Sequence, residues 1–224
     1  RSSTRDTPLT RAAMLGANDA IRVLLAHGAD KNAAGVAGST ALHQAASMGA
    51  LATVRLLLDN GAAIDPRNSG GGSPLYAAAN SSHVGILELL LERGADPRTT
   101  DGQGNNVLFP AARAFKGDAA RFFLNKGVPV DSRNPGGETP LIYGAPYGFV
   151  DTVRALIEGG ADLEARDNQG NTALLATARS GRIETMRLLL EKGANIEAKN
   201  KDGQTPLLVA ACATYAPDDK KLEM

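Results

Sequence analysis

The chain has 224 residues, of which 43% are hydrophobic and 4% aromatic, and its 24 lysines and arginines balance 24 aspartates and glutamates. A net charge of zero disfavours bulk electrostatic binding to nucleic acid or to an anionic membrane, and no apolar run reaches the roughly 18 residues of a membrane span. The lone cysteine, Cys212, excludes an intrachain disulfide, argues against a structural zinc site, and predicts a reducing, intracellular location, cytoplasmic or nuclear.

Sequence markers recur every 33 residues along the whole chain. A Thr, Ser or Asn is followed two residues later by Leu, and a glycine keeps the same spacing further along each unit. Markers that differ in residue type do not align seven times by chance, so the chain is an array of repeats. The first marker falls at Thr7, Thr40, Ser73, Asn106, Thr139, Thr172 and Thr205, and the second at Gly28, Gly61, Gly94, Gly127, Gly160 and Gly193.

Each unit predicts two helices and a finger, as the first repeat shows. The marker Thr or Ser is an N-cap, and a proline in the next position, such as Pro8, has its φ preset for a helix. Gly16 predicts the turn into a second helix, whose apolar residues recur at helical spacing. That helix stops at Gly28, in the left-handed C-cap position. The polar stretch that follows, rich in Asn, Asp and Gly, predicts a hairpin-like finger.

The second unit carries the fullest form of the pattern and resembles the ankyrin-repeat family. That resemblance implies an all-α solenoid, with residues 1–224 as a single domain whose repeats are capped near 7, 40, 73, 106, 139, 172 and 205. It also implies that partners dock on the concave face, formed by the fingers and the first helices. The matching residues are Thr40-Ala41-Leu42-His43, Ala45-Ala46, Gly49, Val54, Leu57-Leu58 and Gly61-Ala62.

Repeats four and five depart from the pattern. Repeat four has Phe115 where the turn glycine belongs and Pro110 in its first helical turn. In repeat five, Pro146 lies about two turns into the first helix, where it should remove a bond to the carbonyl of Ile142 and shorten or kink the helix. Aromatic residues also gather between Tyr76 and Phe149. Two interpretations are open: drift in tolerant middle repeats, or a groove reshaped for a ligand.

The seventh repeat is incomplete. Its first helix is expected to run through Ala211, but no Leu-Leu pair or closing glycine follows. The tail Lys221-Leu222-Glu223-Met224 predicts the start of a second helix after a longer loop. Because the chain also begins with Arg1 rather than Met, we expect a fragment of a longer protein, and no signal peptide is recognised in it.

No catalytic, metal or cofactor site is predicted, and we expect no enzyme activity. His27, His43 and His83 lie in different repeats at positions that are not equivalent. His43 is expected to hydrogen-bond locally with the Thr40 cap, and Cys212 has no histidine partner in the pattern. The Asp and Glu residues of the fingers recur with the period, so they are expected to be structural.

The register of the repeats selects candidate partner-binding positions on the concave face. They lie seven or eight residues after the cap or just before the marker glycine. Exposed Arg and Lys are usually only solvated, but a basic row in a neutral chain favours an acidic partner segment, and Tyr and Arg are common in binding hot spots. The candidates are Met14, Leu15, Met48, Arg93, Arg113, Lys126, Tyr147, Arg179 and Lys192.

A modification site is a further candidate. In some members of the resembling family, an asparagine four residues after the marker glycine is hydroxylated. Asn32 occupies that position here, with Leu24 and Asp30 placed as in such substrates.

We therefore expect a protein–protein interaction scaffold, monomeric, that binds a protein or peptide and no nucleic acid or membrane. The alternative is a regulatory or recognition domain of a larger enzyme, receptor or channel whose active part lies outside these residues.

Overall fold

The computed structural model describes residues 6–214, and in that range every regular element is helical and none is a strand. The predicted all-α solenoid is therefore confirmed. The first helices of the seven repeats are α1 (Pro8–Met14), α3 (Ala41–Ser47), α5 (Pro74–Asn80), α7 (Leu108–Ala112), α9 (Pro140–Gly144), α11 (Ala173–Arg179) and α13 (Pro206–Thr214). The second helices are α2 (Asn18–Ala26), α4 (Leu51–Asp59), α6 (Val84–Glu92), α8 (Asp118–Asn125), α10 (Val150–Glu158) and α12 (Ile183–Glu191). Two 3-10 helices, η1 (Val36–Gly38) and η2 (Ala145–Tyr147), complete the set.

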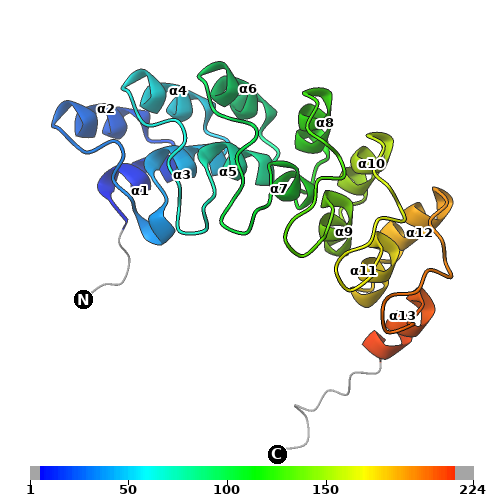
Figure 1. The fold of residues 1–224 in the computed structure, drawn as a ribbon. Coiled ribbons are helices and arrows are strands. Elements are labelled where there is room, and N and C mark those ends of the chain that lie inside the picture. The colour runs from blue at the N-terminus through cyan, green and yellow to red at the C-terminus, as the bar shows by residue number, and fades with distance from the viewer. Residues whose placement is uncertain (1–5, 215–224) are drawn as a thin grey trace, which may run out of the picture.

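The helix pairs stack side by side into a curved array, with α1 and α13 at its two ends (Figure 1). In the N-terminal half the first helices lie between the row of second helices and the projecting fingers. Small residues such as Ala45, Ala46 and Ala78 are fully buried where first helices meet, and Leu57 and Leu90 are fully buried on the second helices. Because each pair buries its apolar face against its neighbours, stability is distributed along the stack.

Most first helices begin at the predicted caps, whereas α7 begins after Val107, which makes no side-chain cap hydrogen bond. The Thr7 side chain accepts a hydrogen bond from the backbone N–H of Thr10 at 3.0 Å, and Ser73 accepts one from Tyr76 at 3.3 Å. Thr40 forms a capping box with His43, whose Nδ1 accepts the Thr40 N–H at 3.2 Å. Each cap satisfies a helix donor that would otherwise be unpaired.

The fingers are held by two recurring side-chain devices. In the first, a carboxylate or amide oxygen accepts two backbone N–H groups of its own turn: Asp101 Oδ1 accepts from Gln103 at 2.8 Å and from Asn105 at 2.9 Å. In the second, a guanidinium joins adjacent fingers. Arg133 donates to the carbonyl of Gly137 in its own finger at 2.7 Å and to that of Arg166 in the next at 2.6 Å. Arg67 and Arg166 repeat the arrangement.

Repeats four and five have shortened first helices. Helix α9 ends at Gly144, and the chain continues as the 3-10 helix η2 through Pro146 to a left-handed Gly148 with φ of 82°. The predicted effect of Pro146 is therefore confirmed. Helix α7 is equally short, and Phe115 in its following turn is 74% exposed. In repeat seven, α13 continues to Thr214, and the predicted second helix over Lys221–Met224 lies outside the described residues.

Candidate partner-binding groove

A groove runs along the stack between the first helices and the bases of the fingers. Two hollows mark it, with volumes of about 340 and 440 Å³. The first is lined from α3, α5 and the end of α7 and includes His43, Tyr76 and Arg113. The second is lined from α9, α11 and their fingers and includes Tyr143 and Arg179. We use "groove" for the surface around these two hollows.

Between the two hollows lies a cluster of Arg113 and two tyrosines. Arg113 Nη1 donates to the Tyr143 hydroxyl at 3.3 Å, and its guanidinium carbon lies 5.1 Å from the centre of the Tyr147 ring. The Tyr143 ring packs edge-on against buried Phe109 at 5.4 Å and lies 6.1 Å from the Tyr147 ring. Burial tends to lower the pKa of Arg113, but the Tyr143 hydrogen bond raises it overall, so the guanidinium stays charged. The cluster offers a positively charged group in a fixed orientation, framed by aromatic rings.

Tyr76 and Asp101 form a second fixed pair in the groove. The Tyr76 hydroxyl donates to Asp101 Oδ2 at 2.7 Å. Burial and this hydrogen bond raise the pKa of Tyr76. Burial alone would raise the pKa of Asp101, but hydrogen bonds from Asn105 and Tyr76 lower it overall. The carboxylate is thus occupied in bracing the finger against α5 and is not a free acid or base.

The bases of the fingers carry a chain of amide and carboxylate hydrogen bonds. Asn134 Nδ2 donates to Asn105 Oδ1 at 3.1 Å and to Glu138 Oε2 at 2.8 Å. Asn200 Nδ2 donates to Asn171 Oδ1 at 3.3 Å in the same way. These interactions link successive repeats and hold the polar floor of the groove in a fixed arrangement.

The predicted residues on the first helices divide between two parts of the stack. Arg113, Tyr147 and Arg179 lie in or beside the groove in repeats four to six. Leu15 and Met48, 70% and 54% exposed, follow the ends of α1 and α3. Met14, also in α1, is half-buried.

The predicted residues before the marker glycines form a separate row. Arg93, Lys126 and Lys192 are the C-cap residues of α6, α8 and α12, and none of them lines the two hollows of the groove. Arg93 is paired with Asp59, its Nη1 2.9 Å from the carboxylate. The predicted basic row therefore divides into two groups. Arg93, Lys126 and Lys192 lie at the ends of second helices, and Arg113 and Arg179 lie in the groove.

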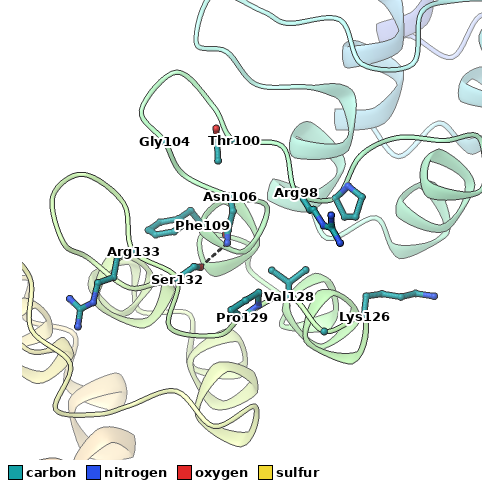
Figure 2. A pocket seen from close by; sticks show the side chains of 12 residues that line it. Arg98, Thr100, Gly104, Asn106, Phe109, Lys126, Val128, Pro129, Ser132 and Arg133 are labelled. Atoms are coloured by element: carbon teal, nitrogen blue, oxygen red, sulfur yellow. Dashed lines mark hydrogen bonds between the residues drawn. The ribbon is translucent and has the colours of Figure 1, made fainter.

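Lys126 borders a third cavity, of about 360 Å³, between the fingers of repeats three and four. Figure 2 shows its wall, with Asn106 Nδ2 donating to Ser132 Oγ at 2.7 Å. The Lys126 side chain extends away from this hydrogen bond (Figure 2), and its ammonium lies 5.7 Å from the centre of the Phe122 ring.

Sequence reasoning missed Tyr76, Tyr143 and the inter-finger arginines. Tyr143 follows the cap by four residues and is half-buried at the groove. Gln44, Ala77 and Ala176 hold the same register position and line the same two hollows, so the period could have placed it there. Arg67, Arg133 and Arg166 share one register at multiples of 33 residues, and that spacing was the signal that could have found them.

Within residues 6–214 no three His, Cys, Asp or Glu side chains gather at a metal-binding spacing, and no helix there could span a membrane. His43 Nε2 lies 3.0 Å from the Gly72 carbonyl while its Nδ1 serves the Thr40 cap, and burial lowers the pKa of its ring. Cys212 is exposed.

A model describing three consecutive ankyrin repeats matches residues 9–101, 75–167 and 159–218. The chain belongs to the ankyrin-repeat family. Ankyrin-repeat domains generally act as protein-interaction modules and are typically not enzymes.

Solved ankyrin-repeat domains show the same architecture along nearly the whole chain. The human ASB11 ankyrin repeat domain is 30% identical, with a TM-score of 0.80 and 92% of each chain covered. The ankyrin repeat domain of Bcl-3, described as a unique member of the IkappaB protein family, is 26% identical, with a TM-score of 0.69 and coverage of 92% of this chain and 94% of that one. No curated protein matches the sequence.

Proposed function

We propose that this ankyrin-repeat domain is an interaction scaffold that binds a segment of a partner protein in the groove. The Arg113 cluster is the observation that carries the proposal. Its guanidinium is oriented by Tyr143 and Tyr147, so little side-chain freedom is lost when a partner binds it. Arg and Tyr in such a setting are the residue types that dominate interface energetics.

We further propose that the bound segment carries carboxylates. Arg113 and Arg179 make no ion pair within the described residues, and each lies at one of the two hollows. Three carboxylates also line the second hollow: those of Asp167 and Glu138 accept side-chain hydrogen bonds from Asn171 and Asn134, and that of Asp202 is exposed. Planar guanidinium groups bind carboxylates bidentately, which favours an acidic segment.

The test is a selection of displayed 12-residue peptides on the wild-type domain, followed by titration of the selected peptides. The double variant Arg113→Glu with Arg179→Glu should weaken the groove-binding peptides by about a hundredfold and reverse their salt dependence, because two attractive charge contacts become repulsive. Arg154→Glu, which makes the same substitution at one exposed position on α10, should leave their affinity unchanged. Acidic peptides that bind the double variant and the wild type equally would refute the proposal.

A protein partner is favoured over nucleic acid because the net charge is zero. The domain should elute early from heparin at low salt and sediment as a monomer. The same groove would serve a free-standing scaffold or the regulatory domain of a larger enzyme, receptor or channel.

We also propose that Asn32 is a hydroxylation site. Its side chain is exposed, its Oδ1 accepts the Ala63 N–H at 2.8 Å, and its own N–H donates to Asp30 at 2.9 Å. Mass spectrometry of the protein from its native cell should show a gain of one oxygen at Asn32. An unmodified residue would refute this assignment.

A further inference from the structure

A second surface lies on the opposite edge of the repeats from the fingers, at the turns between first and second helices. An apolar cleft of about 470 Å³ there spans repeats four to six and is lined by Phe115, Tyr147, Phe149 and Ile183. Phe115 is 74% exposed and Ile183 66% exposed, so neither residue is needed for the core. Contiguous exposed apolar residues of this kind typically mark an interaction surface.

The aromatic rings of the cleft are held in place by one another. Phe115 packs edge-on against Phe149 at 5.6 Å, and Phe149 stacks on Tyr147 at 6.5 Å with 12° between the ring planes. Phe115 occupies the register position that is Gly16, Gly49 and Gly181 in other repeats. A large ring at a turn position that glycine normally fills adds apolar surface to the outside of the molecule and nothing to its interior.

A buried threonine beside the cleft also supports the conclusion that this edge of the stack is an interaction surface. Thr152 Oγ1 donates to the Ala114 carbonyl at 2.7 Å, and Thr53, in the same register, donates to Asn18 Oδ1 at 2.8 Å. Thr185 is the next member of this series, is 1% exposed and lines the cleft, but its hydroxyl has no hydrogen-bond partner within the described residues. The turn that should supply one is the irregular turn that contains Pro146. Unpaired buried hydroxyls are uncommon, and they concentrate where structure is adapted to something other than its own stability.

The charges around the cleft indicate what it binds. Arg182, whose Nε donates to the Pro146 carbonyl at 2.9 Å, lines the cleft and passes over Gly148. It makes no ion pair within residues 6–214, whereas Glu184, the carboxylate that lines the cleft, lies beside Arg187. An apolar cleft lined by an unpaired cation complements an apolar side chain next to a carboxylate.

We propose that this cleft is a second partner-binding site, which takes a large apolar side chain (Leu, Ile, Met or Phe) flanked by Asp or Glu in a segment of another protein. The cleft lies apart from the two hollows of the groove and shares Tyr147 with the Arg113 cluster between them. Tyr147 lies between the two sites, with one neighbour in each: Arg113 in the groove and Phe149 in the cleft. One partner could therefore pass from the groove over this edge of the stack.

The same peptide selection tests the proposal with a different pair of variants. Phe115→Ser with Ile183→Ser should weaken a class of peptides that contain an apolar residue beside an acidic one, by about tenfold or more. These peptides should be insensitive to Arg113→Glu with Arg179→Glu, and groove-binding peptides should be insensitive to the serine variants. Val23→Ser with Ile196→Ser, which removes two exposed apolar side chains elsewhere, is the matched control.

Circular dichroism and the thermal midpoint should show that the serine variants remain folded, since both side chains are on the surface. Amide spectra should place the peptide-induced shifts at Phe115, Ile183 and Thr185. The proposal is overturned if no selected peptide is sensitive to the serine variants. It is equally overturned if the wild type sediments as a dimer that these variants dissociate, because the occupant would then be a second copy of the chain.

Discussion

Arg113 lies over the Tyr147 ring across the junction of repeats four and five, with its guanidinium carbon 5.1 Å from the ring centre. The contact joins two residues 34 positions apart, in adjacent repeats, so it contributes both to the interface between the repeats and to the proposed groove. The coupling energy between the two side chains can be measured in the free domain, without a binding partner.

A double-mutant cycle with Arg113→Ala and Tyr147→Ala should give a coupling energy of about 0.5–1 kcal/mol in urea unfolding, as expected for a partly exposed cation–π contact. The Lys126–Phe122 pair, at 5.7 Å, is the matched comparison and should couple more weakly, because an ammonium is better hydrated than a guanidinium and does not stack on the ring. Strict additivity of the Arg113 and Tyr147 effects would show that the contact is incidental.

The two members of this pair were accessible from sequence, but their contact was not. The repeat register alone placed both residues near the groove, because Arg113 follows its cap by seven residues and Tyr147 follows its cap by eight. Their meeting depends on Pro146, which ends α9 and turns residues 145–147 into a 3-10 helix. A periodic pattern predicts what the repeats share, and Thr7, Gly28 and Leu57 could all be assigned from it. The Tyr143–Arg113 and Phe115–Phe149 contacts each join residues of the two irregular repeats. The pattern that the repeats share therefore does not predict them.

His43 makes stability depend on pH. Its Nδ1 accepts the Thr40 N–H, and burial lowers its pKa below the ordinary value of 6.5. The unfolded chain therefore binds a proton at His43 at higher pH than the folded chain does. The free energy of unfolding is then highest above pH 6.5 and falls as the pH drops below it toward the folded pKa. Urea unfolding between about pH 5 and 8 should show this loss.

His43→Gln should remove that part of the pH dependence, and His27→Gln, in an exposed position after α2, should retain it. The His43→Gln variant should also be less stable than the wild type at about pH 7.5, by about 1 kcal/mol, because a glutamine that keeps the capping box cannot also reach the Gly72 carbonyl as His43 Nε2 does. An unchanged pH profile in His43→Gln would show that another group is responsible.

The inter-finger arginines should contribute measurably to stability. Arg166→Ala removes hydrogen bonds from a charged donor to the carbonyls of Gly170 and Lys199, in two adjacent fingers. We expect a loss of about 1–2 kcal/mol in unfolding free energy, reduced from the value for buried charged donors because the fingers are exposed. Arg98→Ala is the control, since its guanidinium makes no hydrogen bond within residues 6–214, and it should change stability by less than about 0.5 kcal/mol. Similar losses in both variants would show that the ladder is a solvated surface feature.

Two glycines in helices should respond to alanine with opposite signs. At Gly144, the last residue of α9, a Cβ would lie 2.6 Å from the Ala112 carbonyl oxygen and 2.7 Å from its Cβ, so the packing of α9 on α7 permits no side chain. Gly144→Ala should therefore destabilise the domain by about 1–3 kcal/mol. At Gly85 in α6, the nearest atom to a new Cβ is Leu51 Cδ2 at 3.9 Å. Gly85→Ala should stabilise the domain by about 0.5–1 kcal/mol, because alanine restricts the unfolded chain and favours the helix.

The two glycine variants also test whether repeats four and five are drifted or constrained. If the short α9 were only tolerated drift, the interface with α7 could relax around the methyl group that Gly144→Ala adds, and the loss would approach zero. A full loss in Gly144→Ala, with the gain in Gly85→Ala retained in the same urea titrations, would mean that the irregular first helices pack as closely as the regular ones. The orientation of Tyr143 and Arg113 above them would then be fixed by that packing, because Tyr143 lies in α9 and Arg113 is the C-cap residue of α7, and the two form the hydrogen bond at the centre of the groove.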